Sequence, residues 1–328
     1  MTMIRKTFLW TLLFALLVTA CAPAAVTTPQ SVPVLTQAVV SQTVTPAPTS
    51  TPQAISYTDG LGRKIKLDHL PQRIVSLTPA TTEILFAVGA GSQVVGRDEF
   101  SDYPALAKSL SSVGGSMGQY STEQIVKLQP DLVIAGEINT PELVKSLQDL
   151  GLTVYYLKNP TTLDEMYTKV QLVGQMTGHS TTDLIASLQS RVAAVDAKIA
   201  TVTTKPTVFY EIDASDANKP YTAGPGTFID LLIQRAGAVN VGSSLKDQYP
   251  QVSLEQVVSL NPSMIVLGDS LYGVTPTAVK ARAGWQSIDA VKTGAIFTFD
   301  DNLASRPGPR LVDGLEQLAK IFHPDLFK

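Results

Sequence analysis

The sequence is poor in the residue types that hold metals and bind nucleic acids. It has one cysteine and three histidines among 328 residues, so neither a disulfide framework nor a His-rich metal site is expected. Charged residues make up only 16% of the chain, the net charge is −3, and no cluster of Lys or Arg occurs. This balance argues against binding of nucleic acid. The histidines, His69, His179 and His323, are far apart in the sequence, and we therefore predict no metal site.

The first residues form a targeting segment. Arg5 and Lys6 precede an apolar run, 7–18, that is too short to span a bilayer, and Cys21 follows directly after Ala20. This arrangement resembles a lipobox, in which the cysteine is lipidated and becomes the first residue after cleavage. We expect residues 1–20 to be a lipoprotein signal peptide and Cys21 to anchor the protein to the extracytoplasmic face of the cell membrane. An ordinary secretory signal with an incidental cysteine is the alternative.

The next segment has the composition of a spacer. Residues 22–53 contain no charged residue and are dominated by Thr, Pro, Ala, Val, Ser and Gln. Such a segment has too few large apolar side chains to offset the entropy of ordering. We predict a disordered tether over residues 21–54 that holds a folded body, 55–328, away from the membrane.

One segment of the sequence occurs twice. Residues 121–136 (STEQIVKLQPDLVIAG) return at an offset of 132 residues as 253–268 (SLEQVVSLNPSMIVLG). Each copy predicts a helix that begins after a serine and ends near a proline, followed by a buried strand. A single long-offset duplicate is not a solenoid. It predicts two related α/β lobes with a cleft between them.

The pattern around the repeats predicts a parallel, doubly wound sheet in each lobe. Apolar runs predict strands at 73–77, 94–96, 132–135, 153–157, 207–212, 264–267 and 296–299, and helical periodicity occurs at 141–150, 163–177, 228–235 and 310–322. Residues 181–200 contain neither Gly nor Pro and predict one long helix of about 30 Å. We expect an N-terminal lobe over 55–178, a bridging helix over 179–203 and a C-terminal lobe over 204–328.

A polar loop follows the first predicted strand of the body. Thr78 to Glu83 offers hydroxyl groups, and the backbone at Pro79 and Ala80 lies at the start of a predicted helix. Such a position suits polar or anionic ligand atoms. Simple helix capping explains the same residues equally well.

Several motifs together are similar to one family. They are PQRIVSLTP at 71–79 followed by Thr82-Glu83, FSDYP at 100–104, VGG at 113–115, PDLVI at 130–134, and RPGPR at 306–310 with Gly314-Leu315-Glu316. They resemble the cobalamin and iron-siderophore branch of the helical-backbone ABC-transporter substrate-binding proteins. The resemblance implies a monomer that binds a small molecule between its lobes, has no enzymatic activity and no cofactor, and acts with permease and ATPase subunits.

The resemblance also implies a role for the repeat. In this family one glutamate on each lobe pairs with arginines of the membrane subunits, and the matching positions are Glu123 and Glu255. Charge-assisted pairs of this kind would fix the register of docking. The alternative is that each carboxylate is simply favoured by the dipole of its helix.

Aromatic residues bear on the identity of the ligand. Cobalamin-binding relatives hold a large, mostly neutral macrocycle, and Phe100 and Tyr249 match their aromatic positions. Tyr120, Tyr221 and Tyr272 are weaker candidates. Ordinary packing is the alternative for each.

Other residues bear on the two competing ligands. Ferric siderophores are usually anionic and would require arginine, which Arg97, Arg306 and Arg310 could supply, although Arg310 could instead brace the fold. Haem-binding relatives place a tyrosine where this chain has Gly115. We therefore place a corrinoid first, a ferric siderophore second and haem third.

A hydrolase motif is also present. Gly114, Ser116 and Gly118 match the Gly-x-Ser-x-Gly pattern of esterases. That pattern requires a buried strand before it and a helix directly after it. The preceding residues 109–112 are polar, so we predict no catalytic residue, and loss of ester hydrolysis on Ser116→Ala would be needed to restore the enzyme hypothesis.

Overall fold

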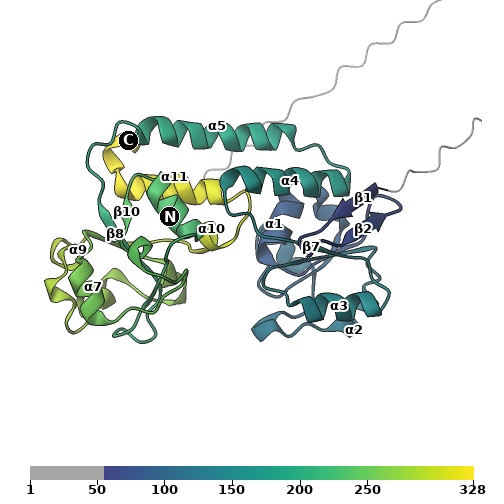
Figure 1. Cartoon of the computed structure of the whole chain (residues 1–328), viewed down its shortest axis with the longest axis horizontal. Helices are drawn as coiled ribbons and strands as arrows, with labels where there is room; N and C mark the ends of the chain where they lie inside the picture. The colour runs from purple at the N-terminus through teal and green to yellow at the C-terminus, as the bar shows by residue number, and fades with distance from the viewer. Residues whose placement is uncertain (1–54) are drawn as a thin grey trace, which may run out of the picture. The chain divides into compact units, whose positions relative to one another are not determined.

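A computed structural model describes residues 55–328 (Figure 1). The predicted signal peptide, the tether and Cys21 lie outside the described residues. The described chain begins with an antiparallel hairpin of β1 (Ile55–Thr58) and β2 (Lys64–Leu67). Two five-stranded sheets follow, one in each half. Within residues 55–328 no helix combines the length and apolarity needed to cross a membrane.

The N-terminal lobe has a parallel sheet in the order β5-β4-β3-β6-β7. Its strands are β3 (Ile74–Ser76), β4 (Val94–Arg97), β5 (Ser111–Ser112), β6 (Leu132–Gly136) and β7 (Val154–Leu157), and its helices are α1 (Pro79–Ala87), α2 (Thr122–Lys127), α3 (Pro141–Asp149) and α4 (Leu163–Thr177). Successive strand residues face opposite sides, because Ile74 packs in the core with α1 and α4 while Val75 packs with α2 and α3. Helices therefore cover both faces of the sheet.

The C-terminal lobe repeats this arrangement. Its parallel strands have the order β10-β8-β11-β12, and β9 is antiparallel to β8. The strands are β8 (Thr207–Asp213), β9 (Tyr221–Thr222), β10 (Val239–Asn240), β11 (Met264–Leu267) and β12 (Ile296–Thr298), and the helices are α6 (Phe228–Arg235), α7 (Leu254–Leu260), α8 (Pro276–Lys280), α9 (Asp289–Thr293), α10 (Asn302–Ser305) and α11 (Leu311–Phe322).

The two copies of the sequence repeat occupy equivalent places. The first copy forms α2 and β6, and the second forms α7 and β11. The repeat strand of each lobe pairs in parallel with the strand of the same five-stranded sheet that comes first in the sequence, β3 or β8. The predicted fold class, two doubly wound α/β lobes joined by a long helix, is confirmed.

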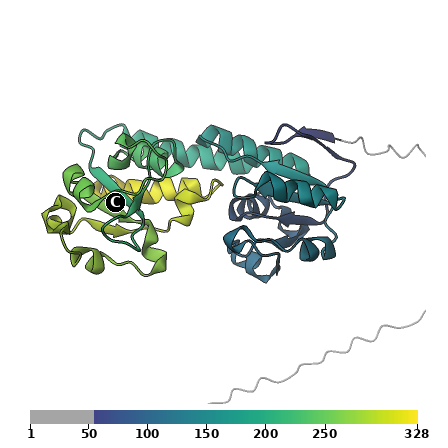
Figure 2. The ribbon, with the colours of Figure 1, turned by 60° about the horizontal axis from the view of Figure 1, so that its bottom comes forward.

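Helix α5 (Thr182–Ile199) connects the lobes and packs against both α4 and α11 (Figures 1 and 2). It has 18 residues, so it is about 27 Å long. One hydrophobic core includes Ile134 of the first sheet, Val192 of α5, Leu315 of α11 and Tyr210 of the second sheet. The lobes therefore share apolar packing in addition to the covalent connection.

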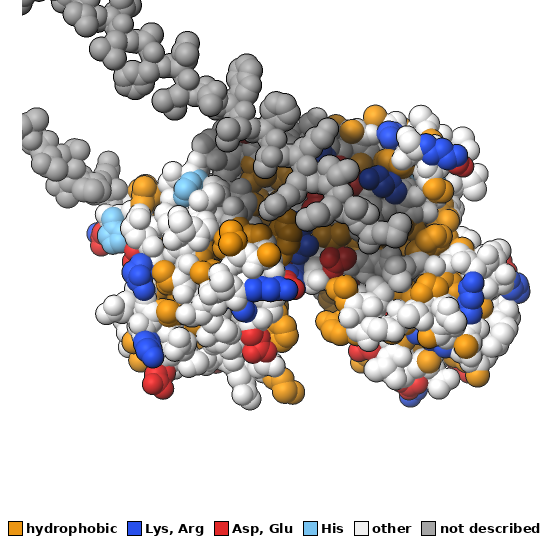
Figure 3. Space-filling model, turned by 180° about the vertical axis from the view of Figure 1, so that it is seen from behind, with side chains coloured by type: hydrophobic (Ala, Val, Ile, Leu, Met, Phe, Trp, Pro, Cys, Tyr) orange, Lys and Arg blue, Asp and Glu red, His pale blue; other side chains and the backbone are white. Residues whose placement is uncertain are grey.

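The described surface carries charges of both signs. Figure 3 shows Lys and Arg side chains scattered among Asp and Glu, without a large patch of either sign on the visible part of that face. Apolar side chains are also exposed, among them Leu106, which is 71% exposed, and Tyr272, which is 88% exposed.

Candidate functional site

A cavity of about 260 Å³ has walls from both lobes. The N-terminal lobe contributes segments that follow the carboxyl ends of β3, β6 and β7, and the C-terminal lobe contributes the turn after α10. The lining residues are Thr78, Pro79, Ala80, Phe100, Glu137, Ile138, Asn159, Ser305, Arg306 and Pro307. Ligands of open α/β sheets bind outside the carboxyl ends of the strands, so this cavity is the candidate site.

A buried chain of polar groups fixes the segment that carries Phe100. Thr82 Oγ1 lies 2.9 Å from Ser76 Oγ and 2.8 Å from Ser101 Oγ. The Ser101 hydroxyl donates to Asp98, whose other oxygen accepts the Phe100 backbone N–H at 2.9 Å. Burial raises the pKa of Asp98. The backbone under Phe100 is thus held in place, while its ring is 53% exposed beside the cavity.

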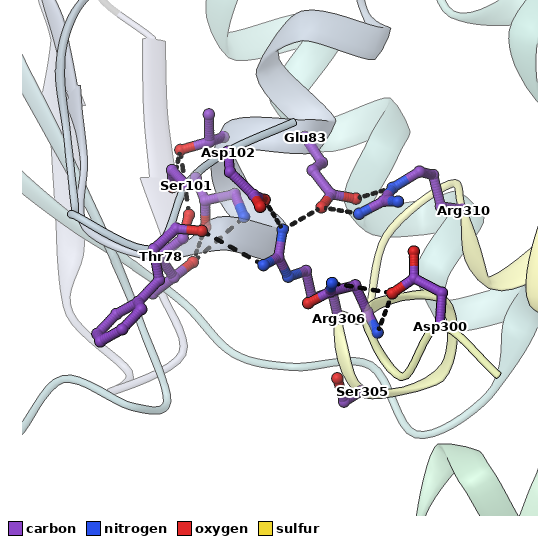
Figure 4. Close-up of polar contacts among 12 residues, drawn as sticks. Thr78, Glu83, Ser101, Asp102, Asp300, Ser305, Arg306 and Arg310 are labelled. Atoms are coloured by element: carbon purple, nitrogen blue, oxygen red, sulfur yellow. Dashed lines mark hydrogen bonds and ion pairs between the residues drawn. The ribbon is translucent and has the colours of Figure 1, made fainter. Parts of the chain in front are cut away.

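Two arginines of the C-terminal lobe converge on one buried carboxylate of α1 (Figure 4). Arg306 donates to Glu83 at 3.0 Å and to Asp102 at 2.7 Å, and its other terminal nitrogen donates to the Phe100 carbonyl at 3.3 Å. Arg310 donates twice to Glu83, at 2.8 and 2.5 Å. We refer to Glu83, Asp102, Arg306 and Arg310 as the inter-lobe clasp, because every one of these ion pairs joins the two lobes.

Three side chains of the clasp, Glu83, Arg306 and Arg310, are largely buried. The side chain of Glu83 is 2% exposed, against 13% for Arg306 and 12% for Arg310. The Arg310 guanidinium also stacks on the Tyr103 ring, 4.0 Å from its centroid. Partial burial of Asp102 opposes ionisation, but the hydrogen bond and the positive charge of Arg306, with smaller contributions from the backbone and Lys108, together outweigh it and lower the pKa of Asp102. Asp102 is therefore a carboxylate at neutral pH.

A second cavity, of about 540 Å³, lies at the carboxyl ends of β8 and β11. Its lining includes Asp213, Asp269, Asp301 and Tyr272. Burial and the neighbouring Glu211 carboxylate raise the pKa of Asp269 to about 7. One oxygen of Asp269 accepts the Ala214 backbone N–H at 3.2 Å, and the other has no hydrogen-bond partner among the described residues.

Four of the predicted ligand-binding residues line the first cavity together: Pro79, Ala80, Phe100 and Arg306. Thr78 caps α1 with its side chain, as simple capping would require. The cavity lies beside this helix start, so the capping and ligand-binding interpretations of the loop are compatible.

Arg97 and Tyr120 are engaged within the N-terminal lobe and do not line the cavity. Arg97 donates to the backbone carbonyls of Ala107, Asp98 and Glu99 at 3.0, 2.7 and 2.8 Å. The Tyr120 hydroxyl donates to a backbone carbonyl of the same lobe at 3.0 Å. Burial, followed by the nearby Asp98 carboxylate, raises the pKa of Tyr120 to about 12. Both side chains are accounted for without a ligand.

The tyrosines of the C-terminal lobe lie outside the first cavity. Tyr249 is 58% exposed, and partial burial together with the nearby Asp301 carboxylate raises its pKa. Tyr272 lines the second cavity, and Tyr221, on β9, is 40% exposed. Of these three tyrosines, Tyr272 is the one that lines the second cavity.

The repeat glutamates occupy equivalent, exposed positions. Glu123 lies in the first turn of α2 and Glu255 in the first turn of α7. Both are exposed, and neither has a Lys or Arg partner within the described chain. Ser253 and Gln256 form a capping box at the start of α7. The Ser121 side chain likewise caps α2, so each helix start has a serine cap.

Sequence reasoning missed several residues of the site: Glu83, Asp98, Asp102, Glu137 and Asn159. A glutamate inside an apolar helical stretch was the one available signal, because a buried charge requires a partner. No group of three or more His, Cys, Asp or Glu in residues 55–328 is placed to hold a metal ion.

The Gly-x-Ser-x-Gly segment lacks the surroundings of a hydrolase. Ser116 lies in an exposed three-residue turn of 3₁₀ helix that follows the two-residue strand β5. The His323 ring is bound to the Gly237 carbonyl of the C-terminal lobe at 3.0 Å.

Comparison with known proteins gives consistent matches. The sequence profile of a family described as periplasmic binding protein matches residues 74–303. The chain is 32% identical to the uncharacterised ABC transporter substrate-binding lipoprotein YvrC of Bacillus subtilis, over 84% of this chain and 87% of that protein. It is 31% identical to a cobalamin-binding protein of Halobacterium salinarum, over 82% and 74%. The structure also resembles the periplasmic heme-binding protein RhuT from Roseiflexus, with a TM-score of 0.69, 27% identity, and coverage of 78% and 99%.

Proposed function

The chain belongs to the periplasmic binding protein family and is a substrate-binding protein of an ABC importer, and from this premise we propose that it captures a corrinoid of the cobalamin type. Proteins of this family are binding proteins, not enzymes, that hold a small molecule and deliver it to a permease. Relatives named for cobalamin and structural neighbours named for haem are both similar to this chain. The choice of ligand therefore depends on the residues of the site.

The lining of the first cavity is the observation that carries the proposal. It contains an exposed aromatic ring, Phe100, on a backbone held by buried hydrogen bonds. A rigid ring of this kind supplies apolar contact area at low entropic cost. The lining contains no His, Cys, Met or Tyr, the side chains that bind haem iron. Cobalamin carries a nucleotide base that can serve as an axial ligand of its cobalt, so it does not require one from the protein and is compatible with such a lining.

Calorimetric titration of the purified full-length protein tests the ligand. We expect binding of cobalamin and cobinamide, and weaker or no binding of haem and of a panel of ferric siderophores. Phe100→Ala should weaken corrinoid binding about tenfold, because a buried aromatic contact is lost. The matched control is Leu106→Ala, since Leu106 is exposed on the same lobe outside this cavity. Binding of siderophores or haem alone would refute the corrinoid proposal.

We also propose that Glu123 and Glu255 dock the two lobes onto the permease. Their equivalent exposed positions on two related lobes suit a partner with two similar subunits. The double variant Glu123→Ala/Glu255→Ala should abolish transport while ligand affinity is unchanged. Glu142, which is exposed in the first turn of α3, provides the control Glu142→Ala. Unchanged transport by the double variant would contradict this assignment.

The extracytoplasmic position proposed for the protein includes a lipid anchor on Cys21. The similarity to a substrate-binding lipoprotein supports this proposal. Cys21→Ser should abolish incorporation of labelled fatty acid and move the protein from the membrane fraction to the soluble fraction. A variant that keeps the label would disprove anchoring through Cys21.

A further inference from the structure

The lining of the first cavity has no basic side chain that is free of an acidic partner. Arg306 is the one Lys or Arg among the residues lining the first cavity. Both of its terminal nitrogens are engaged, one with Glu83 and Asp102 and the other with the Phe100 carbonyl. The clasp as a whole has two arginines and two carboxylates, so it contributes no net charge. The cavity therefore holds no cation that is available to an anionic ligand.

Three acidic side chains that line the two cavities have no basic partner in the described part of the chain. Glu137 lines the first cavity, and Asp213 and Asp301 line the second. In the described part of the chain, no Lys or Arg nitrogen lies within salt-bridge distance of any of these three carboxylates. Asp301 accepts the Tyr210 hydroxyl at 2.8 Å, and Asp213 accepts the Ser215 backbone N–H at 2.7 Å. Each carboxylate has further acceptor capacity, because an ionised carboxylate accommodates about four hydrogen bonds.

The two cavities occupy corresponding places in the two lobes. The second cavity lies at the carboxyl ends of β8 and β11, as the first lies at the carboxyl ends of β3 and β6. Asp301, in the second cavity, directly precedes α10 (Asn302–Ser305), and Ser305 lines the first. A ligand larger than the first cavity would therefore extend towards the second. It would meet carboxylate acceptors in both.

We propose that this cleft selects a neutral or cationic macrocycle whose rim carries primary amides, and that it rejects ligands that present carboxylates. Amide N–H groups would donate charge-assisted hydrogen bonds to Glu137, Asp213 and Asp301. A carboxylate at the same place on the ligand would face a like charge with no cation to compensate it. The inference rests on the proposed corrinoid function and adds the chemical feature by which the ligand is recognised.

Corrinoids allow a test in which ligand size is constant. Mild acid hydrolysis converts single peripheral amides of cobalamin to carboxylates, and the resulting monocarboxylic isomers can be separated. We expect at least one isomer to bind the purified full-length protein about tenfold more weakly than cobalamin, as the loss of one charge-assisted hydrogen bond predicts. For that isomer, Glu137→Gln or Asp213→Asn should reduce the difference to about threefold or less. Both substituted side chains are exposed, so folding should be preserved.

A control variant and three alternative results distinguish the inference from the corrinoid function on which it rests. Asp183→Asn also removes an exposed carboxylate, on α5, outside both cavities, and it should leave the difference between amide and acid unchanged. If cobalamin binds and every monocarboxylic isomer binds equally well, the inference is wrong and the corrinoid function stands. If cobalamin does not bind at all, both are wrong. If Asp183→Asn acts like Glu137→Gln, general charge rather than the cleft is responsible, and the inference is again overturned.

Discussion

Removal of the charge on Glu83 should destabilise the protein far more than removal of an exposed carboxylate. Glu83 is 2% exposed and accepts three hydrogen bonds, one from Arg306 and two from Arg310. The substitution Glu83→Gln keeps the size of the side chain and turns an NH₂ group towards the guanidinium groups. Arg306 still has the charged partner Asp102, whereas Arg310 loses its carboxylate partner and retains its stacking on Tyr103.

The expected magnitude follows from this burial. Removal of one partner of a buried ion pair costs about 3–5 kcal/mol, mainly because the remaining charge is left uncompensated. The exposed pair of Lys145 and Asp149 provides the comparison, since its side chains are 73% and 64% exposed at a separation of 2.7 Å. Asp149→Asn should change the free energy of unfolding by about 0.5 kcal/mol or less.

Urea unfolding followed by circular dichroism measures both effects. With a slope of about 3 kcal/mol per molar urea, Glu83→Gln should lower the midpoint by about 1 M or more. The double variant Glu83→Met/Arg310→Met removes both charges, so it should be more stable than Glu83→Met alone. A Glu83→Gln protein within about 1 kcal/mol of the unaltered protein would refute the reasoning, as would additive effects in the double variant.

Two further predictions concern the C-terminal lobe. Because the pKa of Asp269 is raised to about 7 from an ordinary value of 3.8, the folded protein holds a proton that the unfolded chain releases. The free energy of unfolding should therefore fall as the pH rises from about 3.8 to about 7, by at most about 1.4 kcal/mol per pH unit. Asp269→Asn should lessen that fall, and equal slopes in urea unfolding across the window would disprove this account. A Cβ atom on Gly224 would lie 1.9 Å from the Asp247 carbonyl oxygen, so Gly224→Ala should cost about 1–3 kcal/mol in thermal unfolding; an unchanged melting temperature would contradict the close approach.

The sequence was sufficient to predict the longer strands and helices of the two sheets and the relation between the lobes, whereas the hairpin of β1 and β2 and the short elements β5, β9, β10, α8, α9 and α10 were not predicted. Apolar runs and helix caps are local signals, and the repeat at 121–136 and 253–268 marked one equivalent helix and strand in each lobe. Helix α5 occupies Thr182–Ile199, within the predicted 179–203. The predicted and observed ends of this helix differ because the last turns of a helix depend on capping and on tertiary contacts, which the hydrophobic periodicity of the sequence does not reveal.

The clasp could not be predicted in the same way. Glu83 is separated from Arg306 by 223 residues and from Arg310 by 227. No local pattern specifies which of several arginines meets a given carboxylate across two lobes. Arg306 was one of the arginines that could serve an anionic ligand, and the structure adds that both of its terminal nitrogens are hydrogen-bonded within the protein. The contacts of Arg97 could not be predicted either, because its partners are backbone carbonyls that come together only in the folded loop.

The buried polar chain under Phe100 has a consequence for how a ligand is distinguished. Ser76, Thr82, Ser101 and Asp98 are hydrogen-bonded among themselves. A ligand that met a disordered loop would have to order it, at about 1–2 kcal/mol per residue, whereas here that ordering is complete when the chain has folded. A segment held by buried hydrogen bonds also cannot change its conformation to fit a molecule of the wrong shape. We therefore expect tight binding and intolerance of the wrong shape to depend on the same four side chains.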